Sequence, residues 1–298
     1  MIYTVTFNPA LDYVLRVGQL APGRLHRAES ASFAPGGKGI NVSAVLQNFG
    51  VPSVATGFVA GDVGEIICRK LEARGIETDF IRIPGQSRVN VKIKGKEETE
   101  INASGPDIPR EALEALAKKL SGVPAGSVLV LAGSVPASLP KDIYERLLAA
   151  LARPDLRVVA DASGELLLDV LPFRPWLIKP NRDELDETFG RHMRSVDEAL
   201  SYAEKLRTMG ARNVIVSMGG GGAMMVTDSG SYYQSVFAGE VVDTVGAGDS
   251  MVAGFIAAKQ WGKDDREALR FAVAAGCATA FRSGLAEPAD VRALLARG

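Results

Sequence analysis

The chain has 298 residues, 47% of them hydrophobic and 23% charged, so it can build a sizeable core and disorder is excluded. Its 34 basic and 35 acidic residues give a net charge of −1, which argues against nucleic acid as a partner. Two cysteines and two histidines exclude a disulfide scaffold and a zinc site. No apolar run approaches the roughly 18 residues that span a bilayer, and the first residues do not resemble a signal peptide. We therefore expect a cytoplasmic protein without a membrane partner.

The first hundred residues predict short strands and two helices. The strands cover 2–7, 13–17, 29–33 and 53–59, and the helices end near residues 49 and 73. Between 80 and 102 the sequence changes to short segments in which polar and apolar residues alternate. This alternation is typical of an antiparallel sheet with one face in water.

After residue 109, strands alternate with helices. We expect strands at 127–131, 157–160, 175–178 and 213–217, a hairpin over 223–236, and helices at 110–120, 141–151, 182–189, 196–208, 249–260, 265–281 and 289–296. Such alternation predicts a mostly parallel sheet covered by helices on both faces. The stretches at about 12–34 and 80–104 do not fit it. We predict that they form a small second sheet inserted into a single domain that spans 1–298.

The strongest functional pattern is VVDTVGAGDSMVAGFIAA at residues 241–258, where small residues lead directly into an amphipathic helix. Small residues let the backbone approach a ligand closely, and the first turn of a helix presents unpaired N–H groups to an anion. Asp249 falls in that turn. It is either an acid that stabilises the helix dipole or a general base beside a phosphate, and the motif alone favours neither.

A second glycine-rich turn, PGGKGIN at residues 35–41, also precedes a predicted helix and carries Lys38 and Asn41. Its spacing is not that of a Walker A loop. A plain flexible turn would account for the glycines. The two polar side chains, however, stand where the backbone can pack against a small ligand, which indicates a binding site.

Two further segments follow buried strands. SMGGGGA at residues 217–223 is too compact for a dinucleotide-binding fingerprint and leads into a hairpin, so a dehydrogenase is disfavoured, while a glycine loop over nucleotide phosphates stays open. In IKPNRDEL at 178–185, Asn181 and Glu184 have the spacing of a helix N-cap and its capping acid. The alternative is that Glu184 helps to hold hydrated Mg²⁺, which favours carboxylates and phosphate oxygens.

Arg88, Asn90 and Lys92 share one face of the strand predicted in SRVNVKI, at residues 87–93. A polar face with two cations is usually solvated, and without other observations we give that interpretation most weight. Further candidate residues are Asp12 in NPALD, Asn102 in EINASGP and Ser134 in AGSVP.

Taken together, these segments resemble one family, the ribokinase-like carbohydrate kinases of the PfkB type. GGKGIN at 36–41 looks like the first signature of that family and DTVGAGDS at 243–250 like the second, and the resemblance covers roughly the full chain. NPALD, SRVNVKI, GSVP and KPNRDEL are similar to its sugar-phosphate kinases, the 1-phosphofructokinases and tagatose-6-phosphate kinases. The resemblance implies an α/β fold, an αβα sandwich with a mostly parallel central sheet and a small β-sheet lid.

The resemblance also implies roles for individual residues. Asp249 would be the catalytic base, and Gly246, Ala247 and Gly248 would form an anion hole. The sugar phosphate would contact Asp12, Gly36, Gly37, Lys38, Asn41, Arg88, Asn90 and Ser134, with Arg88 on its phosphate. ATP would contact Lys179, Asn181, Ser217, Gly219, Gly222 and Cys277, with Cys277 against the adenine. Mg²⁺ would be held near Glu184 and Asp161.

The implied reaction is ATP-dependent phosphorylation of the free primary hydroxyl of a ketohexose monophosphate, foremost fructose 1-phosphate to fructose 1,6-bisphosphate. Tagatose 6-phosphate and fructose 6-phosphate are alternative substrates, although relatives that act on fructose 6-phosphate can lack the lysine found here at position 38. A sugar-phosphate sensor without catalysis is a further alternative, disfavoured because Asp249, Lys179 and Glu184 are all present. We expect a homodimer that pairs through the lid sheet.

Overall fold

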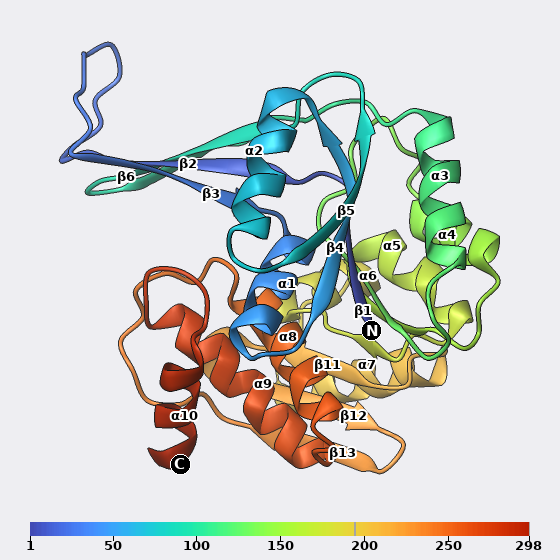
Figure 1. Ribbon diagram of the computed structural model, residues 1–298. Coiled ribbons are helices and arrows are strands. Elements are labelled where there is room, and N and C mark those ends of the chain that lie inside the picture. The colour runs from blue at the N-terminus through green and yellow to red at the C-terminus, as the bar shows by residue number, and fades with distance from the viewer. Residues whose placement is uncertain (194, 298) are drawn as a thin grey trace.

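Nine strands form a large sheet and four form a small one within residues 1–193 and 195–297, which the computed structural model describes (Figure 1). The large sheet has the order β13-β12-β11-β10-β9-β8-β1-β4-β5. Its strands are β1 (Ile2–Thr6), β4 (Ser53–Ala60), β5 (Glu77–Ile83), β8 (Val128–Ala132), β9 (Arg157–Asp161), β10 (Leu177–Ile178), β11 (Val214–Ser217), β12 (Ala223–Thr227) and β13 (Gly230–Gln234). All neighbours from β5 to β11 run parallel, and β12 and β13 add an antiparallel hairpin at one edge.

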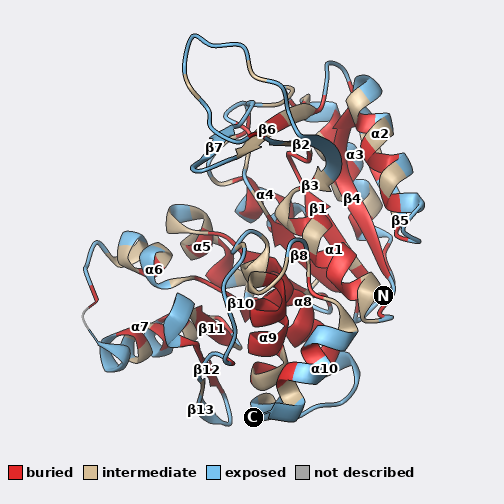
Figure 2. Ribbon diagram, turned by 90° about the vertical axis from the view of Figure 1, so that its left-hand side faces the viewer, coloured by how far each residue is buried: buried red, intermediate tan, exposed pale blue. Residues whose placement is uncertain are grey.

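Helices cover both faces of this sheet, as predicted. One face is packed by α3 (Arg110–Ser121), α4 (Ile143–Leu151), α5 (Gly164–Val170), α6 (Arg182–Phe189) and α7 (Val196–Thr208). The other is packed by α1 (Lys38–Asn48), α2 (Gly61–Glu72), α8 (Ala247–Gln260), α9 (Asp265–Ala280) and α10 (Pro288–Arg297). Strand β8 shows why three layers form: Leu129 joins the first core and Val130 the second, because successive strand residues point to opposite faces. Most residues of helices α8 and α9 are buried (Figure 2).

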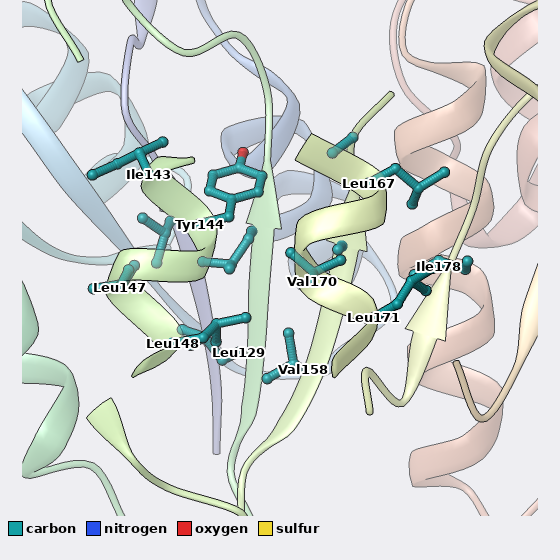
Figure 3. Close-up of a cluster of buried hydrophobic side chains, with 14 of the residues drawn as sticks. Leu129, Ile143, Tyr144, Leu147, Leu148, Val158, Leu167, Val170, Leu171 and Ile178 are labelled. Atoms are coloured by element: carbon teal, nitrogen blue, oxygen red, sulfur yellow. The ribbon is translucent and has the colours of Figure 1, made fainter. Parts of the chain in front are cut away.

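In the core on the α4 side, apolar side chains of α4 and α5 pack against Leu129 of β8 and Val158 of β9 (Figure 3). Phe7, directly after β1, stacks with Phe58 at 5.8 Å and with Tyr144 at 5.6 Å between ring centroids. The Tyr144 hydroxyl donates to the carbonyl of Gly133, which follows β8, at 3.4 Å. Full burial of one such side chain is worth about 1.5–3 kcal/mol. The loops after β1 and β8 therefore leave the sheet from a rigid base.

The small sheet has the order β3-β2-β6-β7 and consists of β2 (Ala10–Arg16), β3 (Ser30–Gly36), β6 (Arg88–Lys94) and β7 (Glu98–Ile101). It projects from the rest of the molecule (Figure 1). The expectation of a purely antiparallel sheet is wrong: two antiparallel hairpins are joined by a parallel pairing of β2 with β6. Strand β2 follows β1 and β6 follows β5, and these two strands of the large sheet are separated by β4 alone.

Two element predictions also fail. Residues 80–83 belong to β5, which pairs in parallel with β4 at the edge of the large sheet, and not to the small sheet. The alternating pattern arises because an edge strand has one partly wet side. Helix α5 was not expected, because its seven residues are too few for a clear helical period. In the described residues no helix has both the length and the apolar character that a membrane span needs.

Candidate active site

A cleft of about 1050 Å³ opens where the carboxyl ends of the parallel strands meet the small sheet. Thr6, Asp161 and Ser217 end their strands there, and Lys179 directly follows β10. Parallel α/β sheets bind ligands at this edge, because the loops after the strands converge on it. The small sheet supplies the opposite wall with Asp12, Arg88, Asn90, Lys92 and Glu100.

Asp249 lies in the first turn of α8 and is 5% exposed. Its Oδ2 accepts a hydrogen bond from Asn41 Nδ2 at 2.8 Å, so the two glycine-led helices α1 and α8 meet at this carboxylate. Gly246 is the N-cap of α8 with φ 80°, a left-handed conformation that suits glycine. A side chain at Gly246 would also collide with Leu285, at 2.6 Å.

Burial raises the pKa of the Asp249 carboxyl to about 6, and the nearby charge of Asp161 acts in the same direction. The hydrogen bond from Asn41 and the charges of Lys38 and Lys179 oppose the shift. A carboxyl with such a pKa is ionised at neutral pH yet is a stronger base than an exposed aspartate, which is what proton abstraction requires.

Two lysines share one buried carboxylate opposite Asp249. Asp161 is 2% exposed, and its two oxygens lie 3.4 Å from Lys38 Nζ and 3.6 Å from Lys179 Nζ. Burial acts to lower the pKa of Lys38, but Asp161, Glu184 and Asp249 together outweigh it and raise that pKa. A Cβ built on Gly248 would lie 3.1 Å from Lys179 Nζ, so this ammonium stands directly against the start of α8. The cleft thus presents two cations and a helix N-terminus to an anion.

The predicted anion hole has one amide already engaged. Ala247 N–H donates to the carbonyl of Thr244 at 3.2 Å, which closes the turn before α8. Gly246, Ala247 and Gly248 all line the cleft. The hole that we predict there depends on the amides beside Ala247, since the first turn of a helix leaves its N–H groups without intrahelical partners.

Asn181 and Glu184 form the capping box that their spacing indicates. Asn181 Oδ1 accepts from Glu184 N at 2.7 Å, and Glu184 Oε2 accepts from Asn181 N at 2.8 Å. The second oxygen, Oε1, lies 3.9 Å from Lys38 Nζ and faces the cleft that Glu184 lines. The N-cap interpretation is therefore confirmed, and it leaves one carboxylate oxygen for a ligand.

Magnesium fits this cleft only together with phosphate oxygens. Among residues 1–193 and 195–297 no three or more acidic, histidine or cysteine side chains gather around a possible metal. Asp161 has an ammonium within 4 Å of each oxygen, which opposes direct ligation of a second cation by it. Mg²⁺ commonly keeps several waters and takes one or two carboxylates plus substrate phosphates, and Glu184 can supply such a carboxylate.

The polar face of β6 is not solvated, contrary to the interpretation that we weighted most. Asn90 Nδ2 donates to Asp12 Oδ1 at 3.0 Å, and Lys92 Nζ lies 3.6 Å from Asp12 Oδ2 and 3.4 Å from Glu100. Arg88 donates to the carbonyls of Asn8 (3.1 Å) and Ala103 (3.4 Å). Its third contact is with the Ser134 hydroxyl, at 3.3 Å. This face therefore lines the cleft with held cations.

Of the predicted substrate residues, one does not line the cleft. Gly36, at the end of β3, packs against Asp12, and a Cβ there would lie 2.7 Å from its carboxylate. The glycine thus makes room for Asp12, while the others reach the cleft wall: Asp12, Gly37, Lys38, Asn41, Arg88, Asn90 and Ser134.

The far end of the cleft holds the predicted nucleotide residues Ser217, Gly219, Gly222 and Cys277. Gly222 has φ 81°, and a Cβ there would lie 2.2 Å from the carbonyl of Gln234, so only glycine closes this turn. Sequence reasoning missed the apolar wall beside them, formed by Val236, Phe237, Val241, Val245, Met251, Val273 and Phe281. It also missed Thr6 and Asn8, which the end of β1 could have indicated.

A buried carboxylate at a glycine-led helix start, with lysines opposite and a long cleft between two sheets, defines a class of enzyme that transfers a phosphoryl group. The chain belongs to the pfkB family of carbohydrate kinases, whose family model matches residues 5–292.

Two curated relatives and one solved structure illustrate the match. The chain is 45% identical to the 1-phosphofructokinase of Bacillus subtilis (strain 168), over 99% of this chain and 97% of that protein. It is 36% identical to the D-tagatose-1-phosphate kinase of Bacillus licheniformis, over 96% and 95%. The structure of phosphofructokinase-2 from Escherichia coli in complex with fructose-6-phosphate superposes with a TM-score of 0.93 at 27% identity, over 99% of this chain and 98% of that one.

Proposed function

We propose that this chain transfers the γ-phosphate of ATP to the free primary hydroxyl of a ketohexose monophosphate, with fructose 1-phosphate as the preferred substrate and fructose 1,6-bisphosphate as the product. One observation carries the proposal: the buried carboxylate of Asp249, held by Asn41, lies near the ammonium groups of Lys38 and Lys179 in a cleft of about 1050 Å³. The names of the 45% and 36% identical relatives support the class of substrate.

Asp249 accepts the hydroxyl proton as the sugar oxygen attacks the γ-phosphorus. The new bond joins that oxygen to phosphorus, the bond to the β-phosphate oxygen breaks, and ADP leaves with the bonding electrons. A positioned base contributes about 10²–10⁴-fold to such a step. The amides of Gly246 and Gly248 and the ammonium of Lys179 stabilise charge on the transferring group, where one donor is typically worth roughly 10²–10³-fold.

ATP lies along the large-sheet side of the cleft in this proposal. Lys179 and Asn181 approach its phosphates, Ser217, Gly219 and Gly222 the nucleotide loop, and Cys277 the adenine. Mg²⁺, when bound with the triphosphate, neutralises part of its charge. We propose that Glu184 holds the ion. Asp161 holds the two lysines in place and does not ligate the metal directly.

The sugar phosphate lies against the small sheet. Asp12, Asn41 and Asn90 bind its hydroxyls, since each offers an acceptor or an amide at the cleft wall. Arg88 binds the phosphate, because a guanidinium offers a bidentate fork to a dianion. Closure of this wall over the sugar limits wasteful transfer to water.

Two observations bear on the choice of sugar. The relatives at 45% and 36% identity are both named for ketohexose 1-phosphates, in which the hydroxyl at carbon 6 is free. Fructose 6-phosphate is bound by a structure that is 27% identical. Lys38, whose Nζ lies 3.4 Å from Asp161 inside the cleft, favours a ketohexose 1-phosphate as the substrate of this chain. D-tagatose 1-phosphate, tagatose 6-phosphate and fructose 6-phosphate remain the rival substrates.

The test is a substrate panel of these four sugar phosphates with MgATP, read as ADP release and, by ³¹P NMR, as new phosphomonoester. We expect the highest kcat/KM with fructose 1-phosphate and the new phosphate on carbon 6. A higher kcat/KM with a 6-phosphate would overturn the substrate assignment. Absence of transfer to all four sugar phosphates, with ATP still bound, would support the alternative of a sugar-phosphate sensor without catalysis.

We also propose that two copies pair through the small sheet and that the enzyme works in the cytoplasm as one domain. Tyr13 and Phe33 stack at 4.3 Å on this sheet, and Phe33 is 47% exposed. A Phe33→Asp variant should shift the sedimentation coefficient to that of a monomer. An unchanged dimer would place the contact elsewhere.

A further inference from the structure

One ion pair joins the small sheet to the loop that precedes α8. Lys94, the last residue of β6, places Nζ 2.6 Å from Asp243 Oδ2. The two side chains are 24% and 19% exposed, so water screens the pair only in part. Among the ion pairs of the described residues, it is the only one that links a strand of the small sheet to any residue beyond 104.

Asp243 also holds the turn that starts α8. Its Oδ1 accepts from Val245 N at 2.9 Å, while its own N–H and that of Val242 donate to the carbonyl of Ala280 at 3.2 and 2.8 Å. The next closure of the turn is Ala247 N to the Thr244 carbonyl. One carboxylate therefore binds the small sheet through one oxygen and the anion-hole turn through the other.

Lys94 stands on the same face of β6 as the residues of the sugar wall. Positions 88, 90, 92 and 94 alternate with residues that point to the other face. Arg88 is held at one end of this row and Lys94 at the other, with contacts to Asp243 and, at 3.5 Å, to Glu98. Burial opposes the charges, but the hydrogen bond between them keeps the pKa of Lys94 raised and that of Asp243 lowered. Both groups are thus charged at neutral pH.

We propose that Lys94 and Asp243 are positioning residues, and that their contact links the seating of the small sheet on the sugar phosphate to the ordering of the amides of Gly246 and Gly248. The inference rests on the proposed phosphoryl transfer, in which those amides stabilise the moving group. Without Lys94, Asp243 keeps its bond to Val245 but loses the cation that fixes its other oxygen. The small sheet then loses its only ionic anchor, within the described residues, to the side of the cleft where transfer occurs.

A merely structural pair would steady the hairpin without affecting the turn, so the test must read the turn itself. The variants are Lys94→Met, Asp243→Asn and the double variant, with Lys94→Arg as the conservative replacement. Lys96→Met is the matched control, because Lys96 is exposed on the same hairpin and loses the same charge.

With fructose 1-phosphate and saturating MgATP, we expect each single variant to lower kcat about tenfold, within the range of coupling between contacting residues. The double variant should be no worse than the poorer single variant, because both remove one interaction. Lys94→Arg should recover most of the loss, and Lys96→Met should match the parent chain. Additive losses, or equal kcat in Lys94→Met and Lys96→Met, would overturn the proposal.

Hydrogen exchange of the free protein separates this inference from the proposed function. Amides of residues 244–249 should exchange faster in Lys94→Met than in Lys96→Met, with α9 unchanged. Equal exchange in the two variants overturns the positioning role whatever the substrate. If Lys94→Met exchanges faster than Lys96→Met but the parent chain phosphorylates none of the sugar phosphates, the positioning role of the contact is upheld and the proposed function is rejected.

Discussion

The large-sheet body and the small sheet hold their polar residues in different ways. Asp161, Lys179 and Asp249 are 2%, 4% and 5% exposed, and packed helices and strands fix them. On the small sheet every residue of β7 is exposed, and Asp12 is positioned by polar contacts with Asn90 and Lys92. The difference separates two tasks. Transfer of phosphorus needs fixed geometry, whereas a sugar must enter and leave. Body residues should therefore govern kcat, and the small-sheet residues that contact the sugar should govern its KM.

The largest expected effect is on the body. Asp249→Asn keeps shape and hydrogen-bonding capacity but removes the base, so kcat should fall by about 10²–10⁴-fold while ATP binding persists. Steady-state kinetics and calorimetric ATP titration measure the two quantities. Asp62→Asn is the matched control, since Asp62 is an exposed acid in the first turn of α2. Near-parental kcat in Asp249→Asn would reject the base assignment.

Arg88→Ala tests the other half of the comparison. Loss of a charge-assisted contact to the sugar phosphate should raise the KM for fructose 1-phosphate by roughly 10–100-fold, with little change in the KM for ATP. Arg82→Ala is the matched control, because exposed Arg82 of β5 pairs with Glu65 and its loss removes the same charge away from the cleft. A change in kcat alone, or equal changes in both KM values, would show that Arg88 does not bind the sugar phosphate.

The pH dependence of kcat/KM tests the assignment of Asp249 as the base. The free enzyme needs ionised Asp249, whose pKa is raised to about 6, so kcat/KM should fall about tenfold per pH unit below that value. The phosphate of the sugar titrates near pH 6 as well, with a second pKa of about 6. The pH profile of the residual activity of Asp249→Asn corrects for titration of the sugar phosphate, because residue 249 does not titrate in that variant. The same slope in that variant would remove Asp249 as the origin.

The smallest expected effect concerns the nucleotide end. Cys277 lines the cleft, and burial raises the pKa of its thiol, so alkylation should be slow and ATP should slow it several-fold further. Cys68, buried in α2 away from the cleft, is an internal control whose rate should not respond to ATP. Mass spectrometry of both peptides gives the two rates. Unprotected Cys277 would remove it from the adenine contact.

The sequence predicted helices with clear end signals correctly and misplaced a strand at the edge of the large sheet. Helices α6 and α7 match their expected ranges, because caps at Asn181 and Ser195 and a clear apolar period mark them. Strand β5 was misplaced because an edge strand has the alternating pattern of a half-wet sheet. Local pattern thus specifies the capped helices of the body better than a strand at the edge of its sheet.

The candidate site shows the same limit. Asp249 and Asn41 could be predicted from sequence because each follows a glycine-rich turn that starts a helix. Small residues at such a turn let the backbone approach a ligand closely. The cations of β6 read as solvated, since their partners Asp12 and Asp243 lie 80 and 149 positions away from Lys92 and Lys94. Only the folded chain brings such charges together. The apolar nucleotide wall was missed for a similar reason, as its residues come from the loop before α8, from α8, and from α9 and its end.

The most direct test is a crystal structure of Asp249→Asn with fructose 1-phosphate and ATP bound together, since loss of the base should preserve the ternary complex. We expect the carbon-6 hydroxyl within hydrogen-bond distance of residue 249, the γ-phosphorus against the start of α8, and the sugar phosphate on Arg88. A sugar bound with its phosphate at residue 249, or a nucleotide whose γ-phosphate lies away from that helix start, would contradict the account.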